Sequence, residues 1–354
     1  MDTVSGYINS GIKITSDLSL INRDEWNDFV LSHPGGNIFQ SPYMVDLYLQ
    51  TGIYEPLCLF AADASGKISG LLVAGIIHNG TFLKRWVSSR AIITGGPLVN
   101  EHEGEIAGEL IRALKRQVSG KVTYIQIRNL HDTSHYKGNI LDNGFTFEDH
   151  LDILFDLTAS QDDLWHAIHT TRRKQISRAE RRGVQIDIPD CPDKETIDKC
   201  YRILENVYRR AGLPLPSEGF FFKSFESLSQ LKMIKAFLAR TEDKIIGFRF
   251  VLLYRDMVYD WYAGSDTRYN DRYPNDILPW AVIKWGKEQG FRIFDFGGAG
   301  HPKEKYGVRD YKLRFGGNVV NYGRYLAVNR PLIYLAARQY LRVKKQKAGS
   351  ENSD

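Results

Sequence analysis

The hydrophobic and polar positions of this chain indicate the same succession of elements twice. In the first half, a helical period marks helices and shorter apolar runs mark strands. The order is two helices, a hairpin, a helix and a strand, predicted at residues 23–31, 42–48, 56–62 with 67–74, 103–118 and 122–128. A polar turn at 63–66 joins the two hairpin strands.

The second half repeats this order about 170 residues later, roughly one domain's length. A hairpin, a strand, a helix and a strand are predicted at residues 234–240 with 244–250, 257–263, 273–289 and 291–296. The hairpin turns are also similar, GKISG at 66–70 and DKIIG at 243–247. Internal duplication is the simplest account. We therefore predict an α+β chain of two similar domains with a cleft between them.

Length and composition agree with this prediction. With 354 residues, 43% hydrophobic and 25% charged, the chain can form two soluble domains of ordinary size. The formal charge of +5 is too small by itself to indicate nucleic-acid binding. Cys58, Cys191 and Cys200 show neither zinc spacing nor a disulfide framework, and no metal is expected. The N-terminus has no signal pattern and no apolar run has membrane length, so we expect a cytoplasmic protein.

The most charged segment lies between the two halves. Ser160 begins a predicted helix that Gly183 ends, with apolar positions along one face. Its C-terminal part holds six cations against the single acid Glu180. The candidate phosphate- or RNA-binding residues among them are Arg173, Lys174, Arg178 and Arg181. Such a surface suits a nucleic acid or a diphosphate-bearing substrate, and the plain alternative is a solvated helix face.

The C-terminal end is first apolar and then basic. Apolar positions from Leu326 to Ala336 are followed by Arg342, Lys344 and Lys345. This pattern predicts either an amphipathic helix that touches a membrane or a packing helix with a disordered tail. The predicted division of the chain is 1–157 for the first domain, 158–323 for the second, and 324–354 for the C-terminal helix and tail.

Residues 290–317 hold the candidate chemistry. A short apolar strand at 291–296 contains Asp295 and ends at a glycine run. After a polar loop the sequence resumes with Tyr311 and Lys312, next to Phe315 and further glycines. An acid inside an apolar strand needs a partner if it is buried, so Asp295 marks either a site or a surface-facing position. The plain alternative for the whole stretch is an edge strand and a glycine-rich hairpin with a solvated lysine.

Four segments are similar to motifs of one family. Residues 173–184, RKQISRAERRGV, resemble the pattern R-x-x-I-x-K-A-x-x-x-G-V, and residues 311–317, YKLRFGG, resemble F-K-x-x-F-G-G. The shorter pieces RAG at 210–212 and FDFGG at 294–298 lie between them. In this order they resemble the FemA/FemB/FemX group of peptidoglycan aminoacyltransferases and its relatives, which consist of two GNAT-like domains in tandem. The resemblance covers roughly residues 20–330.

The resemblance implies an acyltransferase and gives roles to individual residues. Lys312 corresponds to the family's lysine at the transfer centre, where an ammonium can stabilise the oxyanion formed when an amine attacks an ester or thioester. Arg210 resembles a phosphate-holding arginine. Tyr259 and Tyr262 lie on the strand that lines the family's channel, although core packing would also explain them. The other candidate substrate-binding residues are Arg272, Asp295 and Tyr311.

The sequence departs from the family pattern at three places. A helical arm in the second domain is absent, because a strand-like pattern follows Gly183 directly. Tyr48 stands where a substrate-binding lysine is expected, and Asn100 followed by Glu101 stands where an acid is expected. These departures concern the muramyl-peptide substrate more than the transfer reaction.

Three functions remain open. The first is aminoacyl transfer from aminoacyl-tRNA, with no further cofactor, to the amine of a peptidoglycan or other cell-envelope precursor, including a lipid-linked one at the inner face of the membrane. The second uses acyl-CoA. Residues 270–275 match the pyrophosphate loop of ordinary GNAT enzymes but contain no glycine and one proline, which argues against this donor. The third is a non-catalytic RNA- or membrane-binding module, which needs no Lys312.

Overall fold

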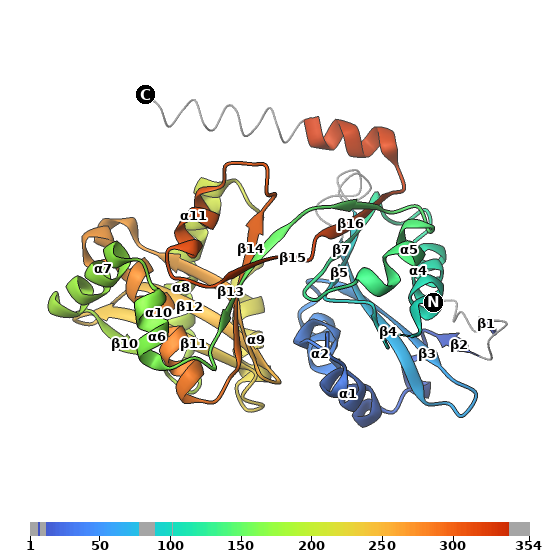
Figure 1. The fold of residues 1–354 in the computed structure, drawn as a ribbon, viewed down its shortest axis with the longest axis horizontal. Helices are drawn as coiled ribbons and strands as arrows, with labels where there is room; N and C mark the ends of the chain where they lie inside the picture. Colours follow the sequence, from blue (N-terminus) through green and yellow to red (C-terminus); the bar gives the residue numbers. More distant parts are fainter. Residues whose placement is uncertain (1–5, 8–11, 78–88, 101, 340–354) are drawn as a thin grey trace. The chain divides into compact units, whose positions relative to one another are not determined.

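The computed structural model describes residues 6–7, 12–77, 89–100 and 102–339. The chain forms two compact units, one of residues 1–149 with 322–354 and the other of residues 150–321. Each unit contains one β-sheet with helices packed against it (Figure 1). The predicted organisation in two units of helices and strands is confirmed. Within the described part, no helix is both long and apolar enough to cross a membrane.

The first unit is built on a sheet whose described strands follow the order β1-β2-β3-β4-β5-β7-β16-β8, with β6 paired to β4. Its strands are β1 (Gly6–Tyr7), β2 (Lys13–Thr15), β3 (Glu55–Ala62), β4 (Ile68–Ile77), β5 (Arg90–Thr94), β6 (Leu98–Val99), β7 (Tyr124–Arg128), β8 (Thr146–Glu148) and β16 (Arg324–Val328). Its helices are α1 (Arg23–Ser32), α2 (Pro42–Thr51), α4 (Gly104–Gln117) and α5 (Lys137–Leu141). The apolar face of α4 packs against β3, β4 and β6 and closes the core.

The second unit is built on a sheet in the order β10-β11-β12-β13-β14-β9-β15. Its strands are β9 (Leu151–Asp156), β10 (Gln185–Asp187), β11 (Ile234–Thr241), β12 (Lys244–Tyr254), β13 (Met257–Ser265), β14 (Ile293–Gly300) and β15 (Asn318–Asn321). Its helices are α6 (Gln161–Ala167), α7 (Thr170–Arg181), α8 (Lys194–Ala211), α9 (Glu218–Leu228), α10 (Pro274–Glu288) and α11 (Gly307–Leu313), with the 3-10 turn η4 (Thr267–Arg272). Ile176 of α7 and Val282 of α10 pack on Phe294 and its neighbours in the core.

The two units repeat one succession of elements. In each, two helices lead into an antiparallel hairpin, and a third strand and a helix then precede a parallel strand. The elements are α1, α2, β3, β4, β5, α4 and β7 in the first unit and α8, α9, β11, β12, β13, α10 and β14 in the second. The parallel pairs are β5 with β7 and β13 with β14. The predicted internal repeat is confirmed.

Strand pairing divides the chain differently from the predicted division. Strand β9 pairs with β14 in the second unit, although residues 151–156 were assigned to the first domain. Strand β16 pairs with β7 and β8 in the first unit, although residues 324–328 were assigned to the C-terminal helix. A short apolar run fits either element, and here its pairing partners decide. The described helix at this end covers residues 331–339, and the more distal cations lie outside the described residues.

The predicted helix over 160–183 is two helices. Ser160 begins α6, since its Oγ accepts the Asp163 N–H at 3.1 Å, as the capping-box pattern predicts. Ile168 then adopts an extended backbone and His169 caps α7. The His169 N–H donates to the Arg314 carbonyl at 2.8 Å, so the break connects α7 to the segment after α11.

Gly317 provides a test of how tightly the second unit is packed. Its φ is +88°, and an added Cβ would lie 2.9 Å from the buried Phe155 ring. At Gly290 φ is +83°, but nothing lies within 4 Å of an added Cβ. We expect Gly317→Ala to lower the free energy of unfolding by about 2–4 kcal/mol, because backbone strain and overpacking add. Gly290→Ala should cost about 1 kcal/mol. Urea unfolding measures both, and equal losses would contradict the packing.

Candidate active site in the second unit

The site forms where two parallel strands of the second sheet separate. Strands β13 and β14 pair only from Met257↔Ile293 to Tyr259↔Asp295. On its other side, β14 leaves the register with β9 between Asp295 and Gly298. Phe296 and Gly297 therefore have no register partner on either side, and their buried backbone carbonyls need other donors.

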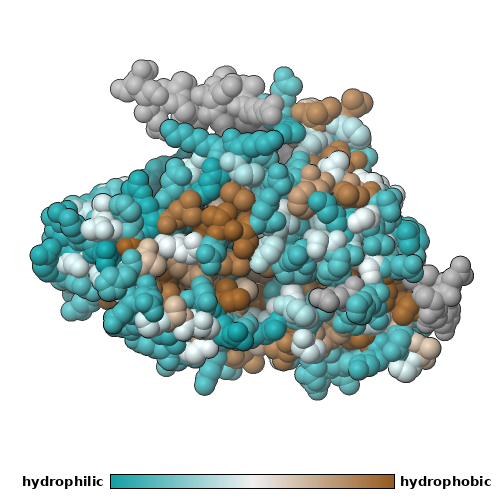
Figure 2. All heavy atoms as spheres, in the orientation of Figure 1, coloured by the Kyte–Doolittle hydropathy of each residue, from teal (hydrophilic) through white to brown (hydrophobic). Residues whose placement is uncertain are grey.

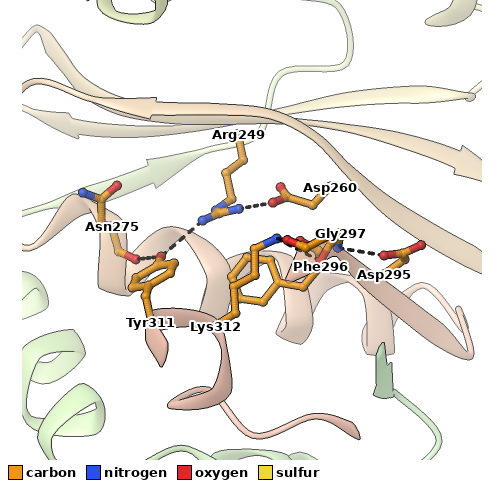
Figure 3. Close-up of polar contacts among 9 residues, drawn as sticks. Arg249, Asp260, Asn275, Asp295, Phe296, Gly297, Tyr311 and Lys312 are labelled. Atoms are coloured by element: carbon orange, nitrogen blue, oxygen red, sulfur yellow. Dashed lines mark hydrogen bonds and ion pairs between the residues drawn. The ribbon is translucent and has the colours of Figure 1, made fainter. Parts of the chain in front are cut away.

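The ammonium group of Lys312 supplies these donors. Its Nζ lies 2.5 Å from the carbonyl oxygen of Phe296, 3.0 Å from that of Gly297 and 3.1 Å from that of Gly298 (Figure 3). A lysine ammonium has three N–H donors, and all three are used here. The Nζ also lies 5.2 Å from the centre of the Phe296 ring.

The structure excludes the solvated hairpin lysine considered as the plain alternative. Residues 307–313 form helix α11, and Lys312 is 9% exposed. Burial lowers the pKa of Lys312, while the carboxylate of Asp260 acts in the opposite direction. Lys312 is thus a buried side chain that binds the backbone of β14, whether or not it also takes part in a reaction.

A buried ion pair lies beside Lys312. The Nη1 atom of Arg249 on β12 lies 2.5 Å from the Oδ2 atom of Asp260 on β13, and the side chains are 6% and 11% exposed. The guanidinium also lies 4.9 Å from the centre of the Phe296 ring. Arg249 Nε and Asp260 Oδ1 are buried without a hydrogen-bond partner. Two buried polar atoms of this ion pair are thus unpaired in the structure.

Tyr311 lies between two arginines. Its hydroxyl accepts a hydrogen bond from Arg249 at 3.2 Å and donates to the Asn275 carbonyl at 2.5 Å (Figure 3). The Arg172 guanidinium lies 5.0 Å from the ring centre and pairs with Asp276 at 2.6 Å. Burial raises the pKa of Tyr311 to about 12, so the hydroxyl stays protonated and can donate. Helices α7, α10 and α11 are joined through this residue.

Asp295 finds its partner in a second carboxyl group. It is 1% exposed, and its Oδ1 accepts the Gly297 N–H at 2.7 Å. Burial and the adjacent Asp152 of β9, to which it is hydrogen-bonded, raise the pKa of Asp295 well above its usual range. Two carboxyl groups in such contact share one proton.

Four other predicted substrate-binding residues lie at different distances from this cluster. Tyr259 is paired with Asp295 across the parallel strands. Tyr262 lies farther along β13, and its ring centre is 4.8 Å from that of Phe221 on α9. Arg210 lies exposed at the C-terminal end of α8, where its Nε donates to a helix carbonyl. Arg272 donates to the carbonyl at the end of α7. Neither arginine belongs to the Lys312 cluster.

The predicted phosphate-binding residues divide into two groups. Arg173, Lys174 and Arg181 line a shallow cavity of about 450 Å³ on α6 and α7, and Arg178 lies outside its lining.

In the first unit, Tyr48 is buried in α2, and the Asn100 amide donates to Glu103 at 2.8 Å. Glu101 lies outside the described residues.

Sequence reasoning missed several residues of the cluster. They are Asp152, Arg172, Arg249, Asp260 and Asp276. Arg249 is a lone charge in an apolar strand, which is the signal that identified Asp295, and it could have been used again. Asp152 carries the same signal, because it stands between Leu151 and Ile153 in an apolar run. Asp276 carries none, because an acid in the first turn of a helix is ordinary. Among the described residues, no group of His, Cys, Asp and Glu could hold a metal ion.

Comparison with known proteins defines the class. Residues 170–313 match the family model described as an acetyltransferase (GNAT) domain, and this segment contains α7, β13, β14 and Lys312. The match covers most of the second unit, and the prediction of an acyltransferase is confirmed. No curated protein matches the sequence.

Solved structures extend the likeness to nearly the whole chain. The crystal structure of FemX is 15% identical, with a TM-score of 0.69, over 89% of this chain and 98% of that one. The C-terminal domain of a putative lysylphosphatidylglycerol synthetase from Agrobacterium fabrum is 14% identical, with a TM-score of 0.57, over 89% and 95%. A tandem GNAT protein from the clavulanic acid biosynthesis pathway is 8% identical, with a TM-score of 0.55, over 93% and 98%.

At these identities the likeness concerns the fold. It confirms the predicted fold of two GNAT-like domains in tandem and, at that level, the resemblance to the Fem group. The roles of the individual site residues and the cleft between the domains stay predictions.

The contacts of Lys312 predict a structural cost for its loss. We expect Lys312→Met to lower the free energy of unfolding by about 2 kcal/mol or more, because the side chain keeps its bulk but leaves the buried carbonyls of Phe296 and Gly297 without this donor. Lys305→Ala, at an exposed position of the preceding loop, should change it by less than about 0.5 kcal/mol. Denaturant unfolding compares the two. A Lys312→Met variant as stable as the wild type would show that the carbonyls find other donors.

The carboxyl pair predicts a pH dependence. Because the pKa of folded Asp295 is raised, its stabilising contribution is complete below the unfolded pKa of about 3.9 and is lost as the pH rises through the folded pKa. We expect the stability of Asp295→Asn relative to wild type to increase between pH 4 and pH 7, by up to about 1.4 kcal/mol per pH unit. Asp156→Asn removes an exposed carboxylate whose pKa is lowered, so it should give a flat difference above pH 5. Parallel curves for Asp295→Asn and wild type would contradict the shared proton.

Proposed function

We propose that this chain is a FemAB-like N-acyltransferase that transfers an aminoacyl group from aminoacyl-tRNA to the amine of a peptidoglycan or other cell-envelope precursor. The observation that carries the proposal is the buried Lys312 centre at the separation of β13 and β14 in a GNAT-type acyltransferase domain. The tandem fold shared with FemX supports the same class of reaction.

In the proposed reaction, the acceptor amine forms a bond to the acyl carbon of the ester. The bond from this carbon to the ribose oxygen breaks, the nitrogen loses a proton and the ribose oxygen gains one. Negative charge develops on the acyl oxygen. Lys312 would exchange its longest bond, 3.1 Å to Gly298, for this oxygen. Arg249 and the Phe296 ring limit access of water, which strengthens the interaction.

The start of α10 favours tRNA over CoA as the donor. Ordinary GNAT enzymes hold the CoA pyrophosphate on free N–H groups at this position. Here Pro274 has no N–H, and those of Asp276 and Ile277 both donate to the Tyr273 carbonyl. The Asp276 carboxyl group is buried in the first turn. A diphosphate would thus meet few free N–H donors at this helix start.

The acceptor in this proposal is a cell-envelope precursor, including a lipid-linked one. The described C-terminal helix exposes Leu332 by 84% and Leu335 by 58%, with Arg338 on the same segment. An exposed apolar pair beside cations suits a peripheral contact with the inner face of a membrane. The name of the lysylphosphatidylglycerol synthetase domain with the same fold is consistent with a lipid acceptor.

One observation favours acyl-CoA as an alternative donor. The matching family model is described as an acetyltransferase domain. A GNAT-type N-acyltransferase in cell-envelope or polysaccharide biosynthesis would then use the same Lys312 centre. A non-catalytic RNA- or membrane-binding module is the remaining alternative, and it would be insensitive to changes at Lys312.

A single-turnover transfer assay tests the proposal. The donors are total tRNA charged with labelled amino acids and labelled acetyl-CoA, and the acceptors are soluble and lipid-linked peptidoglycan precursors. We expect label to move from charged tRNA. Lys312→Arg should be slower by about 100-fold or more at saturating donor, because the planar guanidinium directs its donors differently. Lys305→Ala should match the wild type.

The possible results separate the three functions. Transfer from acetyl-CoA alone would select the second function. Equal rates for wild type and Lys312→Arg would remove Lys312 from the mechanism, provided circular dichroism shows both proteins folded. No transfer from either donor to these acceptors, together with retained RNA or vesicle binding, would favour the non-catalytic module.

A further inference from the structure

Helix α7 carries its cations on two sides with different environments. On the side that faces the rest of the second unit, Arg172 pairs with Asp276 at 2.6 Å and Arg182 pairs with Asp271 at 3.3 Å. Arg182 also lies 5.5 Å from the centre of the Tyr273 ring. These cations are neutralised by carboxylates on α10 and in the turn before it.

The other side of α7 lines a cavity of about 450 Å³, which we call the α6–α7 cavity. Its lining residues are Trp165, Thr170, Arg173, Lys174, Ser177, Glu180 and Arg181. Arg173 donates to the Thr170 hydroxyl at 3.3 Å, and its Nε is buried without a partner. Among the described residues, Arg173, Lys174 and Arg181 form no ion pair with a carboxylate within 4.0 Å, so three cations face one acid, Glu180. The surface over α7 is mostly hydrophilic (Figure 2).

An aromatic wall completes the cavity. Trp165 of α6 is partly exposed, and the Trp280 ring of α10 supports it at 4.9 Å between ring centres. A supported indole next to cations is the combination that binds single-stranded nucleic acid, since a base stacks on the ring while cations hold the phosphates. A face that is only solvated needs neither a concave shape nor an aromatic wall.

The cavity adjoins the Lys312 centre through consecutive residues. Arg172, which lies 5.0 Å from the Tyr311 ring, directly precedes Arg173 in the cavity. The start of α7 is also bonded to the segment after α11, through His169 and Arg314 at 2.8 Å. The cavity is therefore lined by the same helix that contacts Tyr311, the neighbour of Lys312 in the sequence.

We propose that the α6–α7 cavity binds a single-stranded, phosphorylated nucleotide segment of the acyl donor, with a base on Trp165 and phosphates on Arg173, Lys174 and Arg181. This inference rests on the proposed function, because it gives a place to the acceptor end of the aminoacyl-tRNA. The nucleotide part of CoA shares the same chemistry, so the experiment includes both ligands.

Binding measurements on the full chain test the inference. The probes are a short single-stranded RNA ending in CCA, uncharged tRNA and CoA, titrated between 50 and 200 mM salt. We expect Arg173→Gln combined with Arg181→Gln to raise the Kd for the CCA RNA at least about tenfold and to reduce the salt slope by about 1.4, or about 0.7 for each lost phosphate contact. Trp165→Leu should raise the Kd about tenfold and leave the slope unchanged, and Trp165→Phe should restore most of the affinity.

Arg178→Gln is the matched control, because it removes the same charge from α7 outside the cavity lining. It should change the Kd by less than about twofold at 150 mM salt, where screening is strong. If it weakens binding as much as the change at Arg173 or Arg181, the cations act as a diffuse patch and the inference fails. Circular dichroism verifies that each variant is folded.

Failure of the inference and failure of the proposed function give different results. If the wild type transfers from aminoacyl-tRNA and the cavity variants transfer and bind equally well, the cavity is rejected and the function stands. If CoA binds, RNA does not, and only acyl-CoA supports transfer, the tRNA donor is rejected. In that case, loss of CoA binding in the cavity variants would still assign the cavity to a phosphorylated nucleotide.

Discussion

One buried ammonium group holds the candidate site of this protein together. Strands β13 and β14 separate after Tyr259 and Asp295, and a separating pair leaves carbonyl oxygens without donors. Lys312 satisfies three of them at once and thereby fixes α11 against β14. In the proposed reaction, the same ammonium group would also supply the positive charge that stabilises a developing oxyanion. A neutral side chain would not.

The surroundings of Lys312 follow from the need to balance charge in a low-dielectric interior. Arg249 is paired with Asp260, and the Asp295 carboxyl shares a proton with its neighbour, so the cluster carries little net charge. The cations of helix α7 also differ in whether a carboxylate neutralises them. Its inward cations have carboxylate partners, whereas those in the α6–α7 cavity have none in the described part of the chain. Unpaired cations cost least at the surface, where a phosphate ligand can reach them.

The sequence alone determined the elements and their repetition. Hydrophobic period, capping residues and turn glycines are local signals, so α2 after Ser41, the two hairpins and the helices before β7 and β14 were all predicted. The FemAB-like motifs pointed to the tandem fold and to Lys312. A lone acid in an apolar strand was enough to identify Asp295, because a buried charge must have a partner.

Tertiary structure decided what depends on partners far apart in the chain. Strands β9 and β16 exchange between the predicted domains because hydrogen-bond pairing, which no local pattern encodes, selects their sheets. The break at Ile168 in the basic helix is stabilised by the hydrogen bond from His169 to Arg314, which lies 145 residues later in the sequence. No local pattern predicts this contact. Whether Lys312 was solvated or buried, and which cations of α7 faced a cavity, depended on packing between helices. Sequence supplied the chemical groups, and the packing of distant segments set their distances and charges.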